Sequence, residues 1–380
     1  MNKLKYEDRI KKLNSLEKFI NGQNQDDILL ILDKRYGEDK WSIICSVMHW
    51  FRVVEDYLCS DNLLKKNKKD YNWGEVYLFI SAVDIVVKGI NDIYKIVKNK
   101  DGIHLFYGEN NIFGDKNKDD WNYFQNIRAI FGAHPTELKD NEEFIVATYP
   151  TPYNSILDRL HGTTKGWDYY TFLWSKKKSK EFLQESFGFK FEDINKYLDK
   201  YIVYLDSLYK EIITMIKDYK KEVARNKIEK NHNPIIQLNI LEQEDKKRLN
   251  SRYKYIIDVL RILINTKITN KYNQNEYEKY REKNIENVSI LYDIIQNPEE
   301  EKLISKIEEV VFCNTEYFTN MSSYYYTKLY EYWNNEDMEE ILLKHFKDRI
   351  PPFNSDIANI KELYCLVKAF NYYKNKEKAP

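Results

Sequence analysis

The sequence predicts a mainly α-helical protein: a four-helix bundle with a small inserted β-hairpin, followed by a second all-helical domain. Three observations lead to this prediction. The 380 residues contain only 11 glycines and 8 prolines, and the last glycine is Gly188, which disfavours turn-rich β and α/β folds. Several segments repeat apolar residues at every third or fourth position, as one face of a helix requires. The chain is also longer than one core comfortably serves, so we expect two domains.

Four segments before residue 230 show the helical spacing. They run from Trp41 to about Leu58, through 79–97, from Trp121 to Phe131, and from about Phe191 to about Lys227. The last is the longest seam, and its shallow packing against the other three is typical of an antiparallel bundle. Its apolar positions are Ile194, Leu198, Tyr201, Leu205, Leu208, Ile212, Met215 and Tyr219.

Two short segments, 143–149 and 168–174, break the helical pattern because they are rich in β-branched and aromatic residues. Prolines and glycines punctuate the chain between them. This pattern predicts a β-hairpin within an insert at about 136–188, between the third and fourth bundle helices.

The polar segment Lys230-Asn-His-Asn-Pro234 follows the long seam and predicts a domain boundary. We therefore expect a helical bundle at 1–230 and a C-terminal helical domain of unassigned role at 231–380. Further helical patterns in that domain occupy roughly 237–266, 273–296, 300–312, 318–334, 336–348 and 354–373.

Composition argues against bulk electrostatic binding. The chain has 60 basic and 60 acidic residues, so no charged tail indicates binding to a membrane or to nucleic acid in general. The N-terminal residues lack the apolar core of a signal peptide, and no stretch approaches the ~18 uncharged apolar residues of a membrane span. We expect a soluble cytoplasmic protein without membrane association, its four isolated cysteines reduced.

The motifs of metal and cofactor sites are missing from the sequence. The glycines form no nucleotide-binding fingerprint, and a single Glu229-x-x-His232 lacks the second copy that a di-metal bundle needs. Asp115-x-Asn117-x-Asp119 begins like a calcium loop but lacks its glycine and closing glutamate, so it favours the acidic start of a helix. We expect neither a metal nor a cofactor.

The segment 121–135, which ends at a proline, combines an arginine and a histidine with an apolar helix stripe. Arg128 lies beside the stripe and His134 on it, and such groups are costly to bury unless they are paired or line a cleft. An imidazole can accept the proton of a ribose 2′-hydroxyl, and a guanidinium can stabilise a phosphorane. The alternative is a positive residue that stabilises the carbonyl end of the helix, since this spacing also arises by chance.

The string Ile127-Arg-Ala-Ile-Phe-Gly-Ala-His-Pro135, closing a helix of a four-helix bundle, resembles the HEPN superfamily. The resemblance covers at most residues 38–228. It implies an all-α homodimer, with Arg128 and His134 as catalytic residues of a metal-independent endoribonuclease. It also implies an RNA substrate, a role in antiviral defence or as a toxin, and an antitoxin or defence protein as partner. Ala129 stands where many active members have Asn, Asp or His, so a non-catalytic dimeric module that binds a protein or nucleic acid is the alternative.

Other segments are weaker candidates for binding. Lys176, Lys177 and Lys178 follow the predicted hairpin and can guide an RNA backbone, although a solvated loop is the alternative. The aromatic residues of 317–333 can stack on bases or pack as a helix face. Asp84 interrupts an apolar run and is either a partner that orients His134 or a helix-edge residue.

Overall fold

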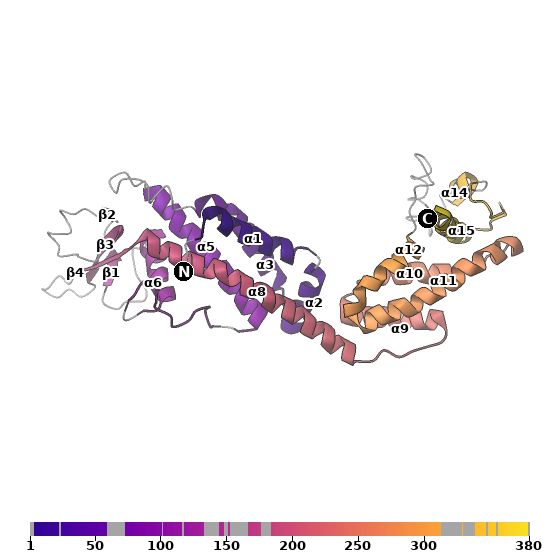
Figure 1. Cartoon of the computed structure of the whole chain (residues 1–380), viewed down its shortest axis with the longest axis horizontal. Helices are drawn as coiled ribbons and strands as arrows, with labels where there is room; N and C mark the ends of the chain where they lie inside the picture. The colour runs from indigo at the N-terminus through magenta and orange to yellow at the C-terminus, as the bar shows by residue number, and fades with distance from the viewer. Residues whose placement is uncertain are drawn as a thin grey trace. The chain divides into compact units, whose positions relative to one another are not determined.

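The protein is mainly helical and divides into two compact units, Met1–Ile216 (unit 1) and Lys217–Pro380 (unit 2) (Figure 1). The division falls within one long helix, ahead of the boundary predicted near residue 230. The helical class is confirmed; the HEPN arrangement stays a prediction. The computed structural model describes residues 4–22, 24–58, 73–100, 102–115, 118–132, 144–147, 151–152, 166–175, 184–312, 329, 339–346, 349–354 and 356–378.

Unit 1 contains the four helices that apolar spacing predicts. They are α3 (Trp41–Val54), α5 (Trp73–Lys98), α6 (Asp120–Ile127) and the first part of α8 (Phe191–Arg225), and the 3-10 helix η1 (Glu55–Tyr57) extends α3. Two further helices, α1 (Tyr6–Ile20) and α2 (Gln25–Tyr36), precede them. Leu13, Leu16 and Ile20 of α1 are almost fully buried, so α1 joins the same core.

Helix α5 supplies a long buried stripe of unit 1, and α3 packs very closely against it at Gly89. A Cβ atom on Gly89 would lie 2.6 Å from Cε1 of Phe51 and 2.7 Å from Cγ1 of Val47. Both side chains are buried in α3. The absence of a side chain at position 89 is therefore what allows the two helices to approach. The fully buried residues of α5 are Val76, Ile80, Val83, Val86, Val87, Ile90 and Ile93.

The predicted pairing of 143–149 with 168–174 is confirmed, but the sheet is larger than a hairpin. Strand β3 (Tyr169–Ser175) pairs antiparallel with β1 (Phe144–Ala147) and β2 (Thr151–Pro152), and β4 (Gln184–Phe189) pairs with it as well. Gly188 is part of β4, where a Cβ atom would collide with the carbonyl oxygen of Tyr169. Gly188 thus serves the close approach of two strands.

Aromatic side chains join the base of this sheet to the helices. Phe189 contacts Phe131 edge-on at 4.9 Å and Phe191 at 5.5 Å between ring centroids. The hydroxyl of Tyr123 donates a hydrogen bond of 2.7 Å to the carbonyl oxygen of Gly188. These contacts fix the C-terminal end of α6 between the sheet and α8.

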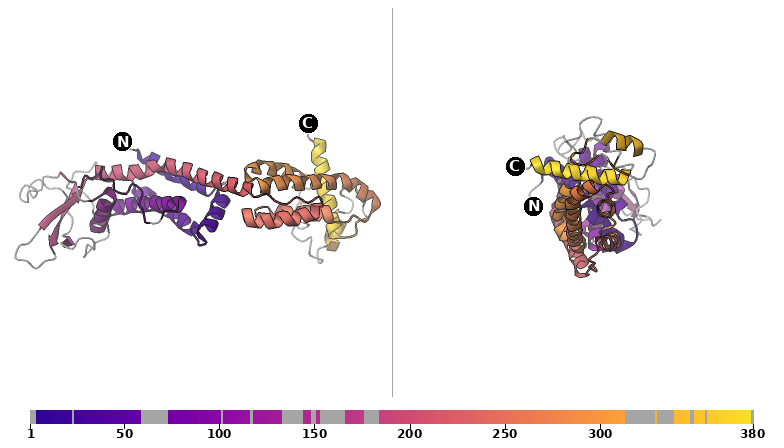
Figure 2. Two further views of the ribbon diagram at one scale, coloured as in Figure 1. Left: turned by 90° about the horizontal axis from the view of Figure 1, so that it is seen from below. Right: turned by 90° about the vertical axis from the view of Figure 1, so that its right-hand side faces the viewer.

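Unit 2 is built from α9 (Pro234–Leu249), α10 (Lys254–Asn265), α11 (Lys271–Gln296), η3 (Pro298–Leu303), α12 (Ile304–Val311), α14 (Glu339–Phe346) and α15 (Ile360–Lys378). Figure 2 shows α15 crossing α11. The helical pattern at 237–266 is divided between two helices, α9 and α10. The chain breaks between them because Asn250 and Ser251 take positive φ angles of 54° and 63°. The predicted helix at 318–334 lies outside the described residues apart from Leu329.

The polar segment before α9 is held by buried side chains of unit 2. Gln296 accepts a hydrogen bond from the amide of Ile228 at 2.8 Å, and Gln237 accepts one from the amide of Asn231 at 2.6 Å. Asn233 caps α9 through the amides of Ile235 and Ile236. The buried amides of Gln237 and Gln296 are thereby satisfied by backbone. Among the residues described, no helix combines the length and the apolar character needed to cross a membrane.

Gly89→Ala is expected to destabilise the protein. Alanine improves helix propensity by ~1 kcal/mol, but overpacking against Phe51 and Val47 costs about 1–3 kcal/mol, so the free energy of unfolding should fall. Chemical denaturation of Gly89→Ala in the wild-type and Val47→Ala backgrounds measures the effect. The cost should be smaller in the Val47→Ala background, and an equal cost in both would contradict the close contact.

Candidate functional site

Arg128 begins the π-helical turn η2 (Arg128–Gly132), which continues α6. Such wide turns are uncommon and often occur at functional sites. A Cβ atom on Gly132 would lie 3.2 Å from Cγ2 of Ile80, so η2 packs directly against α5. The turn leaves Arg128 at the surface, whereas Ile130 and Phe131 of the same turn are buried.

The guanidinium of Arg128 is held by a buried carboxylate of α5. Its Nε lies 3.3 Å from Oδ2 of Asp84, a residue that is only 6% exposed. Lys88 contacts the same oxygen at 2.9 Å, and Gln125 lies 3.5 Å from Oδ1. Two cations thus share one carboxylate, which leaves a local excess of positive charge.

The outer part of the Arg128 side chain stays open to solvent. The side chain is 43% exposed, and its two terminal nitrogens donate no hydrogen bond within the part of the chain that the structure describes. A guanidinium fixed at Nε with both terminal nitrogens free has the geometry of a fork for a phosphate or carboxylate. The site can therefore bind an anion without a metal.

The other predicted site residues lie outside the described residues. These are His134 of the proposed catalytic pair and the three lysines Lys176, Lys177 and Lys178. The meeting of Arg128 with His134 thus stays a prediction. Asp84 is a buried residue of α5 that pairs with Arg128 and Lys88. That it orients His134 stays a prediction.

Besides the predicted His134, another histidine, His104, lies beside α5 and α6. His104 stacks on Trp121 of α6 at 4.0 Å between centroids, and its Nδ1 lies 3.4 Å from Nδ2 of Asn91 on α5. Asn91 lies seven residues after Asp84 and Trp121 seven before Arg128, so α5 and α6 run antiparallel. His104 is therefore about 10 Å along the helices from Arg128.

Burial lowers the pKa of the His104 imidazole, and Lys95 adds to this effect. The ring is accordingly neutral near pH 7, so Nδ1 can accept the hydrogen bond that the Asn91 amide offers. Sequence reasoning did not single out His104, because its neighbours on α5 and α6 are distant in the chain. Its stacking on Trp121 also serves packing.

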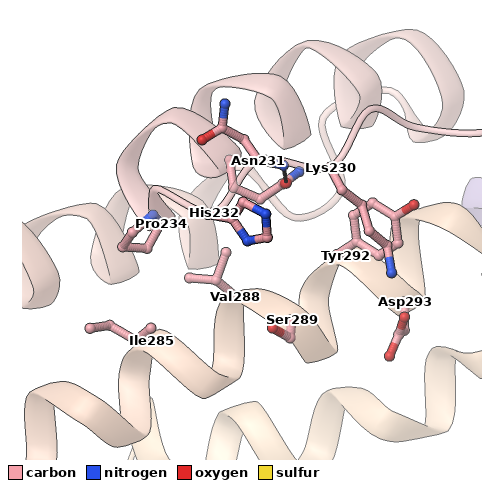
Figure 3. Close-up of a pocket in the computed structure, with 10 residues that line it drawn as sticks. Lys230, Asn231, His232, Pro234, Ile285, Val288, Ser289, Tyr292 and Asp293 are labelled. Carbon is pink, nitrogen blue, oxygen red and sulfur yellow. Dashed lines mark hydrogen bonds between the residues drawn. The ribbon is translucent and has the colours of Figure 1, made fainter.

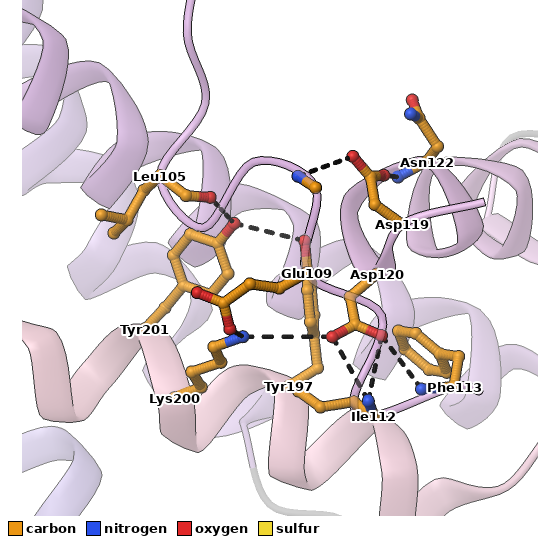
Figure 4. Close-up of polar contacts among 11 residues, drawn as sticks. Leu105, Glu109, Ile112, Phe113, Asp119, Asp120, Asn122, Tyr197, Lys200 and Tyr201 are labelled. Atoms are coloured by element: carbon orange, nitrogen blue, oxygen red, sulfur yellow. Dashed lines mark hydrogen bonds and ion pairs between the residues drawn. The ribbon is translucent and has the colours of Figure 1, made fainter. Parts of the chain in front are cut away.

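The loop that carries His104 is anchored to α6 and α8 by polar contacts (Figure 4). Asp120 accepts hydrogen bonds of 3.1 Å from the amides of Ile112 and Phe113. Lys200 of α8 pairs with Glu109 at 2.7 Å, and the hydroxyl of Tyr201 donates to the carbonyl oxygen of Leu105 at 3.1 Å. These contacts satisfy the buried carboxylate of Asp120 and pair Lys200 with Glu109. The network therefore holds the loop in place and leaves none of these groups free for chemistry.

The acidic start of α6 is confirmed. Asp119 caps the helix by accepting a hydrogen bond of 2.8 Å from the amide of Asn122, and Asp115 accepts one of 3.0 Å from the amide of Lys118. In the ranges that the structure covers, no group of three or more His, Cys, Asp or Glu side chains can hold a metal ion.

Unit 2 has a cavity of about 350 Å³ between the segment 230–237 and α11 (Figure 3). The ammonium group of Lys230 lies 4.7 Å from the ring centroid of Tyr292, whose hydroxyl donates to the carbonyl oxygen of Ile228 at 3.1 Å. His232 points toward α11 and is exposed. No hydrogen bond or ion pair joins its ring to the residues described, so nothing there orients or activates it.

Arg128→Ala is expected to leave the fold nearly intact, whereas Asp84→Ala should not. Arg128 is half exposed, so its ion pair contributes about 0–1 kcal/mol to stability, and Asp84 keeps Lys88. Removing Asp84 leaves two neighbouring cations and a partly buried Gln125 amide without their acceptor, which costs about 1–3 kcal/mol. Urea denaturation measures both, and an equal loss in the two variants would contradict this division of roles.

Comparisons with models of protein families, with curated proteins and with solved structures found no match for this chain.

Proposed function

We propose that the chain is a metal-independent endoribonuclease of HEPN type that acts in the cytoplasm, in antiviral defence or as a toxin. The observation that supports this proposal is the exposed Arg128 fork in a π-helical turn, fixed by the buried Asp84. A guanidinium that is paired at Nε, and whose terminal nitrogens donate to none of the described residues, suits a phosphodiester whose charge increases in the transition state. Lys88 adds positive charge at the same carboxylate.

In the proposed reaction, the 2′-oxygen of a ribose attacks the adjacent phosphorus while His134 takes its proton. Arg128 stabilises the charge on the phosphorane, and the bond from phosphorus to the 5′-oxygen breaks as that oxygen receives a proton from water. The products are a 2′,3′-cyclic phosphate and a 5′-hydroxyl. Lys176, Lys177 and Lys178 are proposed to guide the RNA backbone, and an antitoxin or defence protein to be the partner.

The purified protein should cleave labelled RNA in the presence of EDTA. Arg128→Ala and His134→Ala should each lower the rate by about 10²–10⁴-fold, because each removes a group that acts in the transition state. Gel electrophoresis of single-turnover reactions with a panel of structured and unstructured RNAs measures the rates.

Two variants in unit 1 serve as matched controls. Arg52 is also exposed and paired with a carboxylate, that of Glu17, and His49 is an exposed histidine of α3. Arg52→Ala and His49→Ala should therefore cleave as the wild type does. A wild type that is inert toward every RNA, or a His134→Ala variant that keeps full activity, would contradict the proposed reaction.

A non-catalytic dimeric module is the second candidate, and an exposed apolar stripe favours it. Ile43, Trp50, Val53 and Tyr57 follow one another on one face of α3 and η1 at spacings of seven, three and four, and each is between 39% and 59% exposed. Apolar side chains gathered on one face commonly mark an interface. A second copy of the chain, packed through the same stripe about a two-fold axis, would cover it.

Trp50→Glu should convert a dimer into a monomer, because it places a charge in the centre of the stripe. Light scattering coupled to size-exclusion chromatography measures the mass. Tyr107→Glu is the matched control, since Tyr107 is 69% exposed but lies outside the stripe. A wild type that is monomeric at high concentration, or a Trp50→Glu variant that stays dimeric, would rule this interface out.

A further inference from the structure

A cavity of about 590 Å³ lies in unit 2 beside α11, α12 and α15. Its size is within the range of small-molecule sites. The three helices contact one another directly, and α15 crosses α11 (Figure 2). The lining residues are Lys283, Asn287, Ile290, Lys306, Glu309, Val310, Phe312, Tyr372, Asn375 and Lys376.

Asn287 is the most unusual member of this lining. It is 0% exposed, and neither its amide nitrogen nor its amide oxygen has a hydrogen-bond partner among the described residues. Asn284, one turn earlier on α11, has an unpartnered amide oxygen, and Asn371 of α15, next to Tyr372, has no partner for either amide atom. Buried amides are normally satisfied, so Asn287 in the lining, with Asn284 and Asn371 each next to a lining residue in the chain, indicates a polar group that the described residues do not supply.

The charged residues around the cavity favour an anion. Lys283, Lys306 and Lys376 oppose a single acidic lining residue, Glu309. Lys306 has no ion-pair partner in the described chain, whereas Lys283 pairs with Glu286. Since Lys306 and Lys376 are exposed, they can turn toward a phosphate at little cost.

Tyr372 of α15 adds an aromatic ring to the lining of this cavity. Its ring is largely buried, and the ammonium group of Lys376 lies 4.9 Å from its centroid. A planar heterocycle stacked on Tyr372 would displace that ammonium group, which then becomes available to a phosphate. An amide with a free donor and a free acceptor matches the edge of a nucleobase.

We propose that this cavity binds a nucleoside monophosphate. The base stacks on Tyr372, the amide of Asn287 pairs with its edge, and Lys306 and Lys376 bind the phosphate. The site lies wholly within unit 2 and uses none of the residues of the proposed ribonuclease, so either assignment can fail without the other.

Isothermal titration calorimetry of the full chain tests the proposal. The probes are AMP, GMP, CMP and UMP, with the four corresponding nucleosides, ribose 5-phosphate and inorganic phosphate as fragments. At least one nucleotide should bind, and each of its fragments should bind about tenfold more weakly or worse. Binding of none of the nucleotides, or equal binding of inorganic phosphate, would overturn the proposal. So would single-stranded RNA that binds at these residues while free nucleotides do not.

Asn287→Leu separates a binding role from a structural one. The substitution removes unsatisfied polar atoms at similar volume, so the melting temperature should stay the same or rise, while nucleotide affinity falls about tenfold or more. Lys306→Gln cannot disturb the core and should weaken nucleotide binding but not nucleoside binding. Lys246→Gln, an exposed lysine of α9, is the matched control and should bind as the wild type does. An Asn287→Leu variant that binds normally, or one that melts earlier because the amide was structural, would overturn the assignment.

Discussion

The buried carboxylate of Asp84 is the constraint on which the candidate site depends. It receives Lys88 from its own helix and Arg128 from η2, so the charge of one buried group fixes two cations at the surface. Burying a carboxylate is costly unless it is paired, and here the pairing also orients Arg128. The same contact links α5, a core helix of unit 1, to the turn that follows α6. The position and orientation of the guanidinium therefore depend on one interaction.

The surrounding fold keeps that turn in place. Tyr123 ties α6 to the sheet at Gly188, and Phe131 packs against Phe189 below the turn. At the other end of α6, Asp120 and Lys200 anchor the loop that carries His104. The turn that carries Arg128 is thus packed against the sheet and α5, while the Arg128 side chain is 43% exposed, a placement that favours preorganised charge stabilisation.

Apolar spacing predicted α3, α5, α6 and α8, because a buried stripe is recorded directly in the sequence. It did not predict α2, whose run Ile28-Leu-Leu-Ile-Leu32 is too continuous to show a period, and the strand patterns did not include β4. The π-helical turn and the pairing of Asp84 with Arg128 arise from contacts across 44 residues of chain, which no local pattern encodes. The arginine itself was predictable as a residue beside an apolar stripe, whereas His104 became visible only when α5 and α6 were seen to run antiparallel.

The two units carry different groups: an exposed guanidinium at the surface of unit 1, and in unit 2 a cavity whose Asn287 has no hydrogen-bond partner among the described residues. The central claim is that Arg128, held by Asp84, stabilises a phosphorane formed by attack of a ribose 2′-oxygen. Mass spectrometry of RNA fragments produced by the protein under EDTA tests this claim most directly, because the chemistry is recorded in the fragment ends. The account predicts 2′,3′-cyclic phosphates with 5′-hydroxyls; fragments with 3′-hydroxyls and 5′-phosphates, or RNA left intact, would contradict it.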